Sequence, residues 1–99
     1  MNLEAEFTQA LEGTIEAAKA HNYFPTYFMQ MLGEYGGVGT ARRLLAKQEI
    51  QQGLMKLAEL ELLKESMEAV VLQEKFRPLF TEAEVAEAHR RLEELGYFK

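Results

Sequence analysis

The residues most suggestive of chemistry in this sequence are a glycine-rich stretch and the two arginines that follow it. Gly-Gly-Val-Gly-Thr occupies residues 36–40, and Arg42 and Arg43 follow it after a single alanine. Exposed amides at a helix N-terminus, with positive side chains beside them, could bind a phosphate. Known glycine loops of this kind follow a β-strand, and one of them needs a lysine near its end. Because a helix-forming run precedes these glycines and the lysine is missing, the stretch favours a tight corner between two helices.

Metal binding and catalysis have little support in the remaining residues. His21 and His89 stand 68 positions apart, and only His89 shares a helix face with a possible second ligand, Glu93. The single serine, Ser66, fits a helix cap better than a nucleophile. All sixteen acidic residues are glutamates, and they stand mostly among lysines, arginines and other glutamates, as on solvated surfaces. The sequence therefore predicts a protein that is not an enzyme, with no catalytic residue, no metal site and no cofactor.

Composition and charge narrow the class of protein further. The chain has 99 residues, no cysteine and a formal net charge of -5. Its length fits one domain, residues 1–99, and its lack of cysteine suits a reducing cytoplasm. No run is apolar and long enough to span a bilayer, so we expect a soluble, cytoplasmic protein. The negative charge disfavours binding to nucleic acids or anionic membranes, and no small molecule is implied.

Helical periodicity runs through the whole chain, and it predicts an all-α fold, a compact domain of five to six short helices in an irregular bundle. The predicted helices cover about 3–21, 25–35, 38–46, 48–62, 67–73 and 82–95. Gly36 or Gly37 is expected to take the left-handed conformation that ends the second helix. Gly53 lies inside the fourth helix, where a glycine costs stability. We therefore expect a neighbouring helix to approach closely there.

The last predicted helix has the clearest boundaries. Thr81 and Glu84 form a capping box, and Gly96 stands where a left-handed cap belongs. The buried stripe of this helix is predicted to consist of Val85, Ala88, Leu92 and Leu95. Tyr97 and Phe98 are then expected to fold back on the core.

Five of the ten aromatic residues lie between residues 23 and 35. The second helix has an apolar face about 140° wide, made of Phe24, Tyr27, Phe28, Met31, Leu32 and Tyr35. Such a stripe most often belongs to the core of a small domain. With Tyr23 added, it could instead form a surface that binds a partner. Met29 falls outside the stripe, so it either packs against another element or is an exposed apolar contact.

The sequence has one basic block, consisting of Arg42, Arg43 and Lys47. In one interpretation these side chains pair with nearby glutamates. In the other they form the polar rim of a partner site and select an acidic partner. The apolar part of that site would be Tyr23, Phe24, Tyr27 and Met29.

Several motifs in the later part of the chain are shared with a known type of domain. They are Gly-Gly-Val-Gly-Thr-Ala-Arg-Arg-Leu-Leu, Gln-Gly-Leu-Met-Lys-Leu, Ser-Met-Glu-Ala-Val-Val, Phe-Arg-Pro-Leu-Phe-Thr and Arg-Arg-Leu-Glu-Glu-Leu-Gly-Tyr-Phe. On these motifs, residues 36–98 resemble a small bacterial domain found in uncharacterised proteins. The resemblance does not extend to the first 35 residues. It implies a self-contained helical domain and carries over no activity and no functional residue.

Two functions follow from these patterns. The leading one is a non-catalytic interaction module that binds a protein partner, or a second copy of itself, through the aromatic and methionine surface of the second helix. The alternative is a helix-turn-helix-like DNA-binding or regulatory protein, formed by residues 38–46, a turn at 47–50 and the fourth helix. That fourth helix offers only Lys56 and, beyond it, Lys64 for phosphate contacts.

Overall fold

The chain folds into helices throughout the part that the structure describes. The computed structural model describes residues 2–47 and 50–99. Its elements are α1 (Leu3–Ala20), α2 (Thr26–Leu45), α3 (Gln52–Glu59), the 3-10 turn η1 (Leu63–Glu65), α4 (Met67–Val71), the 3-10 turn η2 (Glu74–Leu79) and α5 (Glu82–Glu94). Neither described range contains a strand. The prediction of an all-α fold is confirmed.

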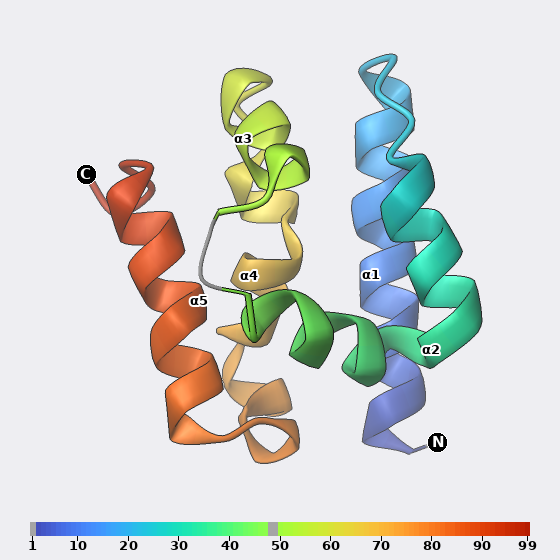
Figure 1. Cartoon of the computed structure of the whole chain (residues 1–99), viewed down its shortest axis with the longest axis vertical. Coiled ribbons are helices and arrows are strands. Elements are labelled where there is room, and N and C mark those ends of the chain that lie inside the picture. The colour runs from blue at the N-terminus through green and yellow to red at the C-terminus, as the bar shows by residue number, and fades with distance from the viewer. Residues whose placement is uncertain (1, 48–49) are drawn as a thin grey trace.

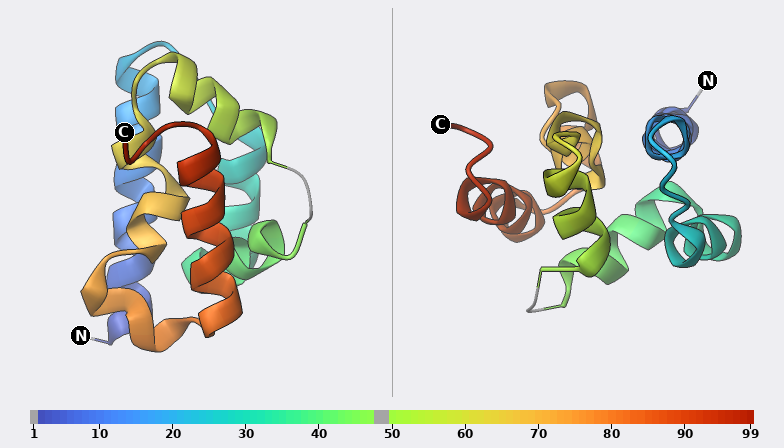
Figure 2. Two further views of the ribbon diagram at one scale, coloured as in Figure 1. Left: turned by 90° about the vertical axis from the view of Figure 1, so that its left-hand side faces the viewer. Right: turned by 90° about the horizontal axis from the view of Figure 1, so that it is seen from above.

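Most of the helices run roughly parallel to the long axis of the molecule. α1 lies on one side and α5 on the opposite side (Figure 1). The first half of α2 runs back along α1. Its second half, drawn in green, turns sideways and crosses toward α5 (Figure 1). Seen from above, α1 and the first half of α2 lie at one end, α5 lies at the other, and α3 lies between them (Figure 2). The short α4 contacts both α1 and α5 and so connects the two ends of the molecule.

The glycine corner divides α2 into two helices, as the sequence predicts. Gly36 takes φ 74° and ψ 177°, a backbone conformation that is almost restricted to glycine. The next residue, Gly37, is buried against α1, and its amide donates a hydrogen bond of 3.0 Å to Oγ1 of Thr8. The glycines therefore allow two helices to pack closely, and the Gly37 amide already has its partner within the fold.

The core has a large cluster and a smaller one. In the large cluster, Phe7 of α1 packs edge-to-face against Phe76 and Phe80, with ring centroids 5.2 and 5.1 Å apart. The smaller cluster joins the end of α1 to α3, and its members are Ala18, Leu57 and Leu62, with Tyr23 and Leu60 packed against it. α1 thus contributes residues to both clusters.

The predicted helix caps are all present. The amide of Thr81 donates to Glu84 Oε1 at 2.9 Å, and the amide of Glu84 donates to Thr81 Oγ1 at 3.1 Å. Ser66 caps α4 by accepting a hydrogen bond of 3.1 Å from the Ala69 amide. Gly96 takes φ 84°, which ends α5 where a left-handed cap is expected. These features depend on residues close together in the chain, and the sequence is sufficient to predict them.

The fourth predicted helix is shorter than expected. Its predicted start, at residue 48, lies outside the described residues, and α3 covers only Gln52–Glu59. Glu61 takes φ 60°, and the Leu62 amide donates back to the Leu57 carbonyl at 2.7 Å. This arrangement is a Schellman-type cap formed without glycine, and it turns Leu62 into the smaller core cluster. The fifth helix is also shorter than predicted, because α4 ends at Val71.

Two packing predictions are wrong. Among the described residues, no helix approaches Gly53 closely, since the nearest atom to a Cβ added there is the hydroxyl oxygen of Tyr23, at an ordinary contact distance of 3.4 Å. Tyr97 and Phe98 do not fold back on the core but stay exposed. Phe98 instead stacks on His89 at the surface of α5, with ring centroids 4.5 Å apart. Phe98 thus covers part of its ring with the His89 side chain of α5.

Candidate functional site

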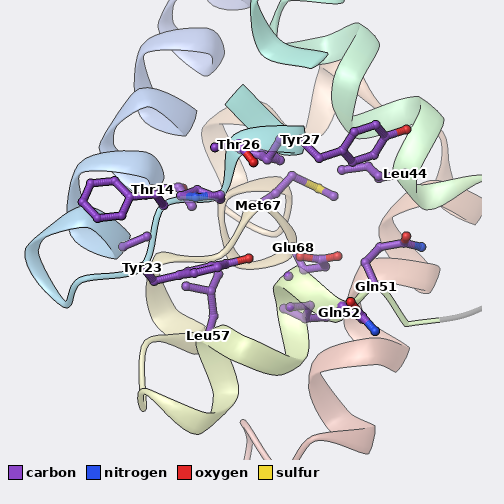
Figure 3. A pocket seen from close by; sticks show the side chains of 16 residues that line it. Thr14, Tyr23, Thr26, Tyr27, Leu44, Gln51, Gln52, Leu57, Met67 and Glu68 are labelled. Carbon is purple, nitrogen blue, oxygen red and sulfur yellow. The ribbon is translucent and has the colours of Figure 1, made fainter. Parts of the chain in front are cut away.

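A pocket of about 490 Å³ lies between the end of α1, the start of α2, α3 and α4 (Figure 3). Its buried lining includes Ala18, Leu57 and Met67. Four aromatic residues line it as well, namely Tyr23, Phe24, Tyr27 and Phe28. Pockets of about 300–1,000 Å³ with mostly apolar walls are typical of sites that bind small molecules or anchoring side chains.

The aromatic stripe of the second helix is only partly a core element. Met31 and Leu32 are buried in the large cluster, but Phe24 is 58 % exposed, Tyr27 63 % and Tyr35 39 %. Of the two interpretations of the stripe, burial in the core therefore does not hold for these three rings. Phe24 and Tyr27 line the open pocket, and the described helices leave more than half of each side chain exposed. The packing of the surrounding helices leaves them available for contact.

The structure brings together only some of the predicted site residues. Tyr23, Phe24 and Tyr27 line the same pocket. The other four are not among its lining residues, and they are Met29, Arg42, Arg43 and Lys47. Met29 is half-buried and packs against the large core cluster.

The arginines of the basic block have partners within the fold. Arg42 donates through Nη2 to the Leu79 carbonyl at 2.9 Å, and its Nε lies 3.6 Å from the Glu84 carboxylate. The guanidinium of Arg43 lies over the ring of Tyr35, 3.8 Å from the ring centroid. Arg42 thus has the intramolecular glutamate contact that the sequence analysis gave as one interpretation.

A buried arginine lies behind the pocket. Arg91 is fully buried, and its Nη1 donates to Glu68 Oε2 at 3.3 Å. Its Nε donates to Glu87 Oε2 at 2.6 Å, and its Nη2 donates to the carbonyls of Leu44 and Lys47 at 2.9 and 2.7 Å. These bonds connect the end of α2 with α4 and α5. Without Arg91, each of these acceptors would lose a hydrogen-bond donor. The guanidinium therefore acts as a structural crosslink.

Glu68 belongs both to this network and to the pocket. It is 3 % exposed, and it is the one charged residue among the described residues that line the pocket. Burial raises the pKa of Glu68 above its ordinary value, although its own backbone amide and Arg91 act in the opposite direction. A further hydrogen-bond donor at this carboxylate would favour its ionised form.

Sequence reasoning did not identify either member of this buried pair. Arg91 follows Ala88 by three positions and precedes Leu95 by four, so it lies on the predicted apolar stripe. This position could have indicated that Arg91 is buried. Glu68 offered no comparable signal, because α4 has only five residues and no clear periodicity. Its burial is set by contacts from other helices.

Comparisons with known proteins supply no relative. No family model, curated protein or solved structure matches this chain. The resemblance of residues 36–98 to a bacterial domain stays a prediction. Within residues 2–47 and 50–99, no three histidine or glutamate side chains are grouped so that they could hold a metal ion. In the same described residues, no helix is long and apolar enough to cross a membrane.

The arginine contacts of Glu87 should make stability depend on pH. Hydrogen bonds from Arg90 and then from Arg91 lower the pKa of Glu87 from 4.5 to about 2, against the opposing effect of burial. A carboxyl group with a lowered pKa in the folded state adds stability above its unfolded pKa and loses this contribution as pH falls through its folded pKa. We therefore expect the difference in melting temperature between the native protein and Glu87→Gln to shrink between pH 4.5 and about 2.

Thermal unfolding followed by circular dichroism would measure this difference. Glu93→Gln removes the same charge from an exposed position of α5 and controls for the change in net charge. A difference for Glu87→Gln that stays constant across this pH range would contradict the assignment.

Proposed function

We propose that this chain is a non-catalytic interaction module that binds a protein partner through an aromatic corner, defined as Tyr23, Phe24 and Tyr27. The observation that carries the proposal is the exposure of Phe24 and Tyr27 beside an open, largely apolar pocket. Single exposed apolar residues are ordinary on protein surfaces. Two large rings at the edge of a pocket are more typical of interfaces, where aromatic anchors contribute much of the binding energy.

The surroundings of the pocket support binding over catalysis. No histidine, serine or lysine is among the described residues that line it. The hydroxyl of Ser66 donates to the Leu63 carbonyl at 2.6 Å and accepts from the Ala69 amide, so it serves as a cap. Glu68 is hydrogen-bonded to a permanently charged arginine, which is a poor arrangement for a proton-transferring base.

The DNA-binding alternative has weaker support. α3 would be its recognition helix, and it has eight residues with Lys56 as its basic side chain. The Lys56 ammonium lies 4.0 Å from the Glu59 carboxylate. Arg42 and Arg43 make the intramolecular contacts described above. A recognition helix with so few free positive charges would lack the phosphate contacts that position such proteins on a duplex.

Selection from a random peptide library displayed on phage would test the proposal. We expect the native protein to select peptides, and the double variant Phe24→Ser and Tyr27→Ser to bind them at least about tenfold more weakly. Because both side chains are largely exposed, the melting temperature should change little. Phe98→Ser removes another half-exposed ring, at the end of α5, and should leave peptide affinity unchanged.

Two results would argue against this function, and a third would identify the partner. Peptides that bind the double variant as tightly as the native protein would place the interface elsewhere. Salt-dependent binding to mixed-sequence duplex DNA would favour the helix-turn-helix alternative. If sedimentation shows a concentration-dependent dimer that Phe24→Ser and Tyr27→Ser abolish, the partner is a second copy of this chain.

A further inference from the structure

The lining of the pocket has the chemistry of a site for an organic cation. Four aromatic side chains and one carboxylate contribute to it, and no lysine, arginine or histidine is among its described lining residues. The faces of aromatic rings attract cations, most strongly where water is excluded. A carboxylate adds a charged acceptor to the same space. This combination favours a positively charged guest over a neutral or negative one.

The Glu68 carboxylate has acceptor capacity left for such a guest. A carboxylate offers about four lone-pair positions. The side-chain carboxylate of Glu68 accepts from Arg91, whose Nη1 lies at a long 3.3 Å from Oε2, and its own backbone amide is a second donor. In Figure 3 the hydroxyl end of Tyr23 points toward the Glu68 side chain, and both residues line the pocket. A hydrogen-bond donor that enters the pocket could therefore contact both the Tyr23 hydroxyl and the Glu68 carboxylate.

The ion-pair network that includes Glu68 has one more negative charge than positive charges. Glu68 and Glu87 both contact Arg91, and Glu87 and Glu94 both contact Arg90. These two arginines and three glutamates sum to a net charge of -1. The whole chain carries -5. An entering cation would be attracted at long range by this excess negative charge, whereas an anion would meet the Glu68 carboxylate, whose contact with Arg91 is long at 3.3 Å.

From these observations, and resting on the function proposed above, we infer that the pocket receives an arginine side chain of the partner protein. A guanidinium is planar, stacks on aromatic rings and is less strongly hydrated than an ammonium, so it costs less to bury. Its head donates to the Glu68 carboxylate. Its alkyl stem packs against the apolar lining at Leu57 and Met67. The aromatic corner covers the mouth of the pocket around this anchor.

Three small molecules of one shape can test the pocket without a known partner. Benzamidine carries a planar cation on an apolar ring, benzamide is its neutral counterpart, and benzoate is the anion. Binding would be followed by chemical-shift changes in ¹H–¹⁵N spectra of the native protein. We expect benzamidine to shift the amides of Tyr23, Gly53 and Glu68, benzamide to bind at least about tenfold more weakly, and benzoate not to bind.

A variant that fills the pocket supplies the matched control. Gly53 lines the pocket, and a Cβ added there meets only ordinary contacts, so Gly53→Leu should fold and should weaken benzamidine binding about tenfold or more. Gly33→Leu places the same side chain in open space on α2 and should leave binding unchanged. A third variant, Tyr27→Leu, removes a ring at an exposed position and should weaken benzamidine several-fold while benzamide changes little.

A second arm uses the peptides selected by the aromatic corner. Replacing their arginine by citrulline, which keeps the shape and removes the charge, should reduce affinity about tenfold or more. Selected peptides without any arginine, binding through Phe24 and Tyr27, would leave the proposed function standing and overturn this inference. Equal affinities for benzamidine and benzamide, preference for benzoate, or benzamidine shifts that Gly53→Leu does not alter would overturn it as well.

Discussion

Replacing Arg91 by methionine should lower the free energy of unfolding by about 3–5 kcal/mol. Methionine keeps the length and apolar character of the stem but removes every hydrogen-bond donor. The Glu68 carboxylate would then be buried without its arginine, and the carbonyls of Leu44 and Lys47 would lose the donor that Arg91 supplies to both. Such uncompensated buried groups are among the most costly consequences of a single substitution.

Urea denaturation followed by circular dichroism would measure this loss. Arg90→Met is the matched control, since Arg90 stands next in sequence but is exposed and pairs with Glu87 and Glu94 at the surface. Its loss should cost no more than about 1 kcal/mol. Adding Glu68→Met to Arg91→Met should restore part of the stability, because no buried charge then remains. Equal losses for Arg90→Met and Arg91→Met would show that the buried pair is not a structural crosslink.

Replacing Gly37 by alanine should destabilise the protein by about 3 kcal/mol. A Cβ on Gly37 would lie 2.7 Å from the Cα of Thr8, and also 2.7 Å from the Thr8 Oγ1 that accepts the Gly37 amide. A backbone atom cannot rotate out of the way as a side-chain tip can. The two helices would have to separate, and the hydrogen bond between them would lengthen or break.

Gly33→Ala provides the comparison in α2, on the other side of the glycine corner. A Cβ on Gly33 meets nothing within 4 Å, so alanine should stabilise the protein by about 0.5–1 kcal/mol through its better helix propensity. The two alanine variants should therefore shift the urea midpoint in opposite directions. A midpoint for Gly37→Ala equal to that of the native protein would mean that α1 and α2 do not meet at this corner.

The aromatic corner illustrates how far the sequence leads toward the candidate site. Tyr23, Phe24 and Tyr27 could be singled out as a possible contact surface, because the clustering of aromatic residues is visible in the sequence. Phe24 and Tyr27 also fitted a core stripe, since periodicity shows which residues share a face and not what covers that face. Only the position of α3 and α4 relative to α2 decides that a pocket remains open there.

Local chemistry was sufficient wherever the deciding residues are neighbours in the chain. The capping box at Thr81 and Glu84, the Ser66 cap and the turns at Gly36 and Gly96 depend on backbone angles and hydrogen bonds within a few residues. The sequence by itself therefore determined the helices, most of their boundaries and the all-α class.

Tertiary structure alone decided which polar side chains are buried. Arg91 reaches Leu44 and Lys47, 47 and 44 positions earlier in the chain, and Glu68, 23 positions earlier. The cost of burying a charge is offset only where helices from distant parts of the sequence bring partners to the same point. The same packing of distant helices places Glu68 beside the aromatic lining of the pocket. The free energy of a buried charge depends on all the groups around it in space and not on its neighbours in sequence, so the sequence alone could not predict this site.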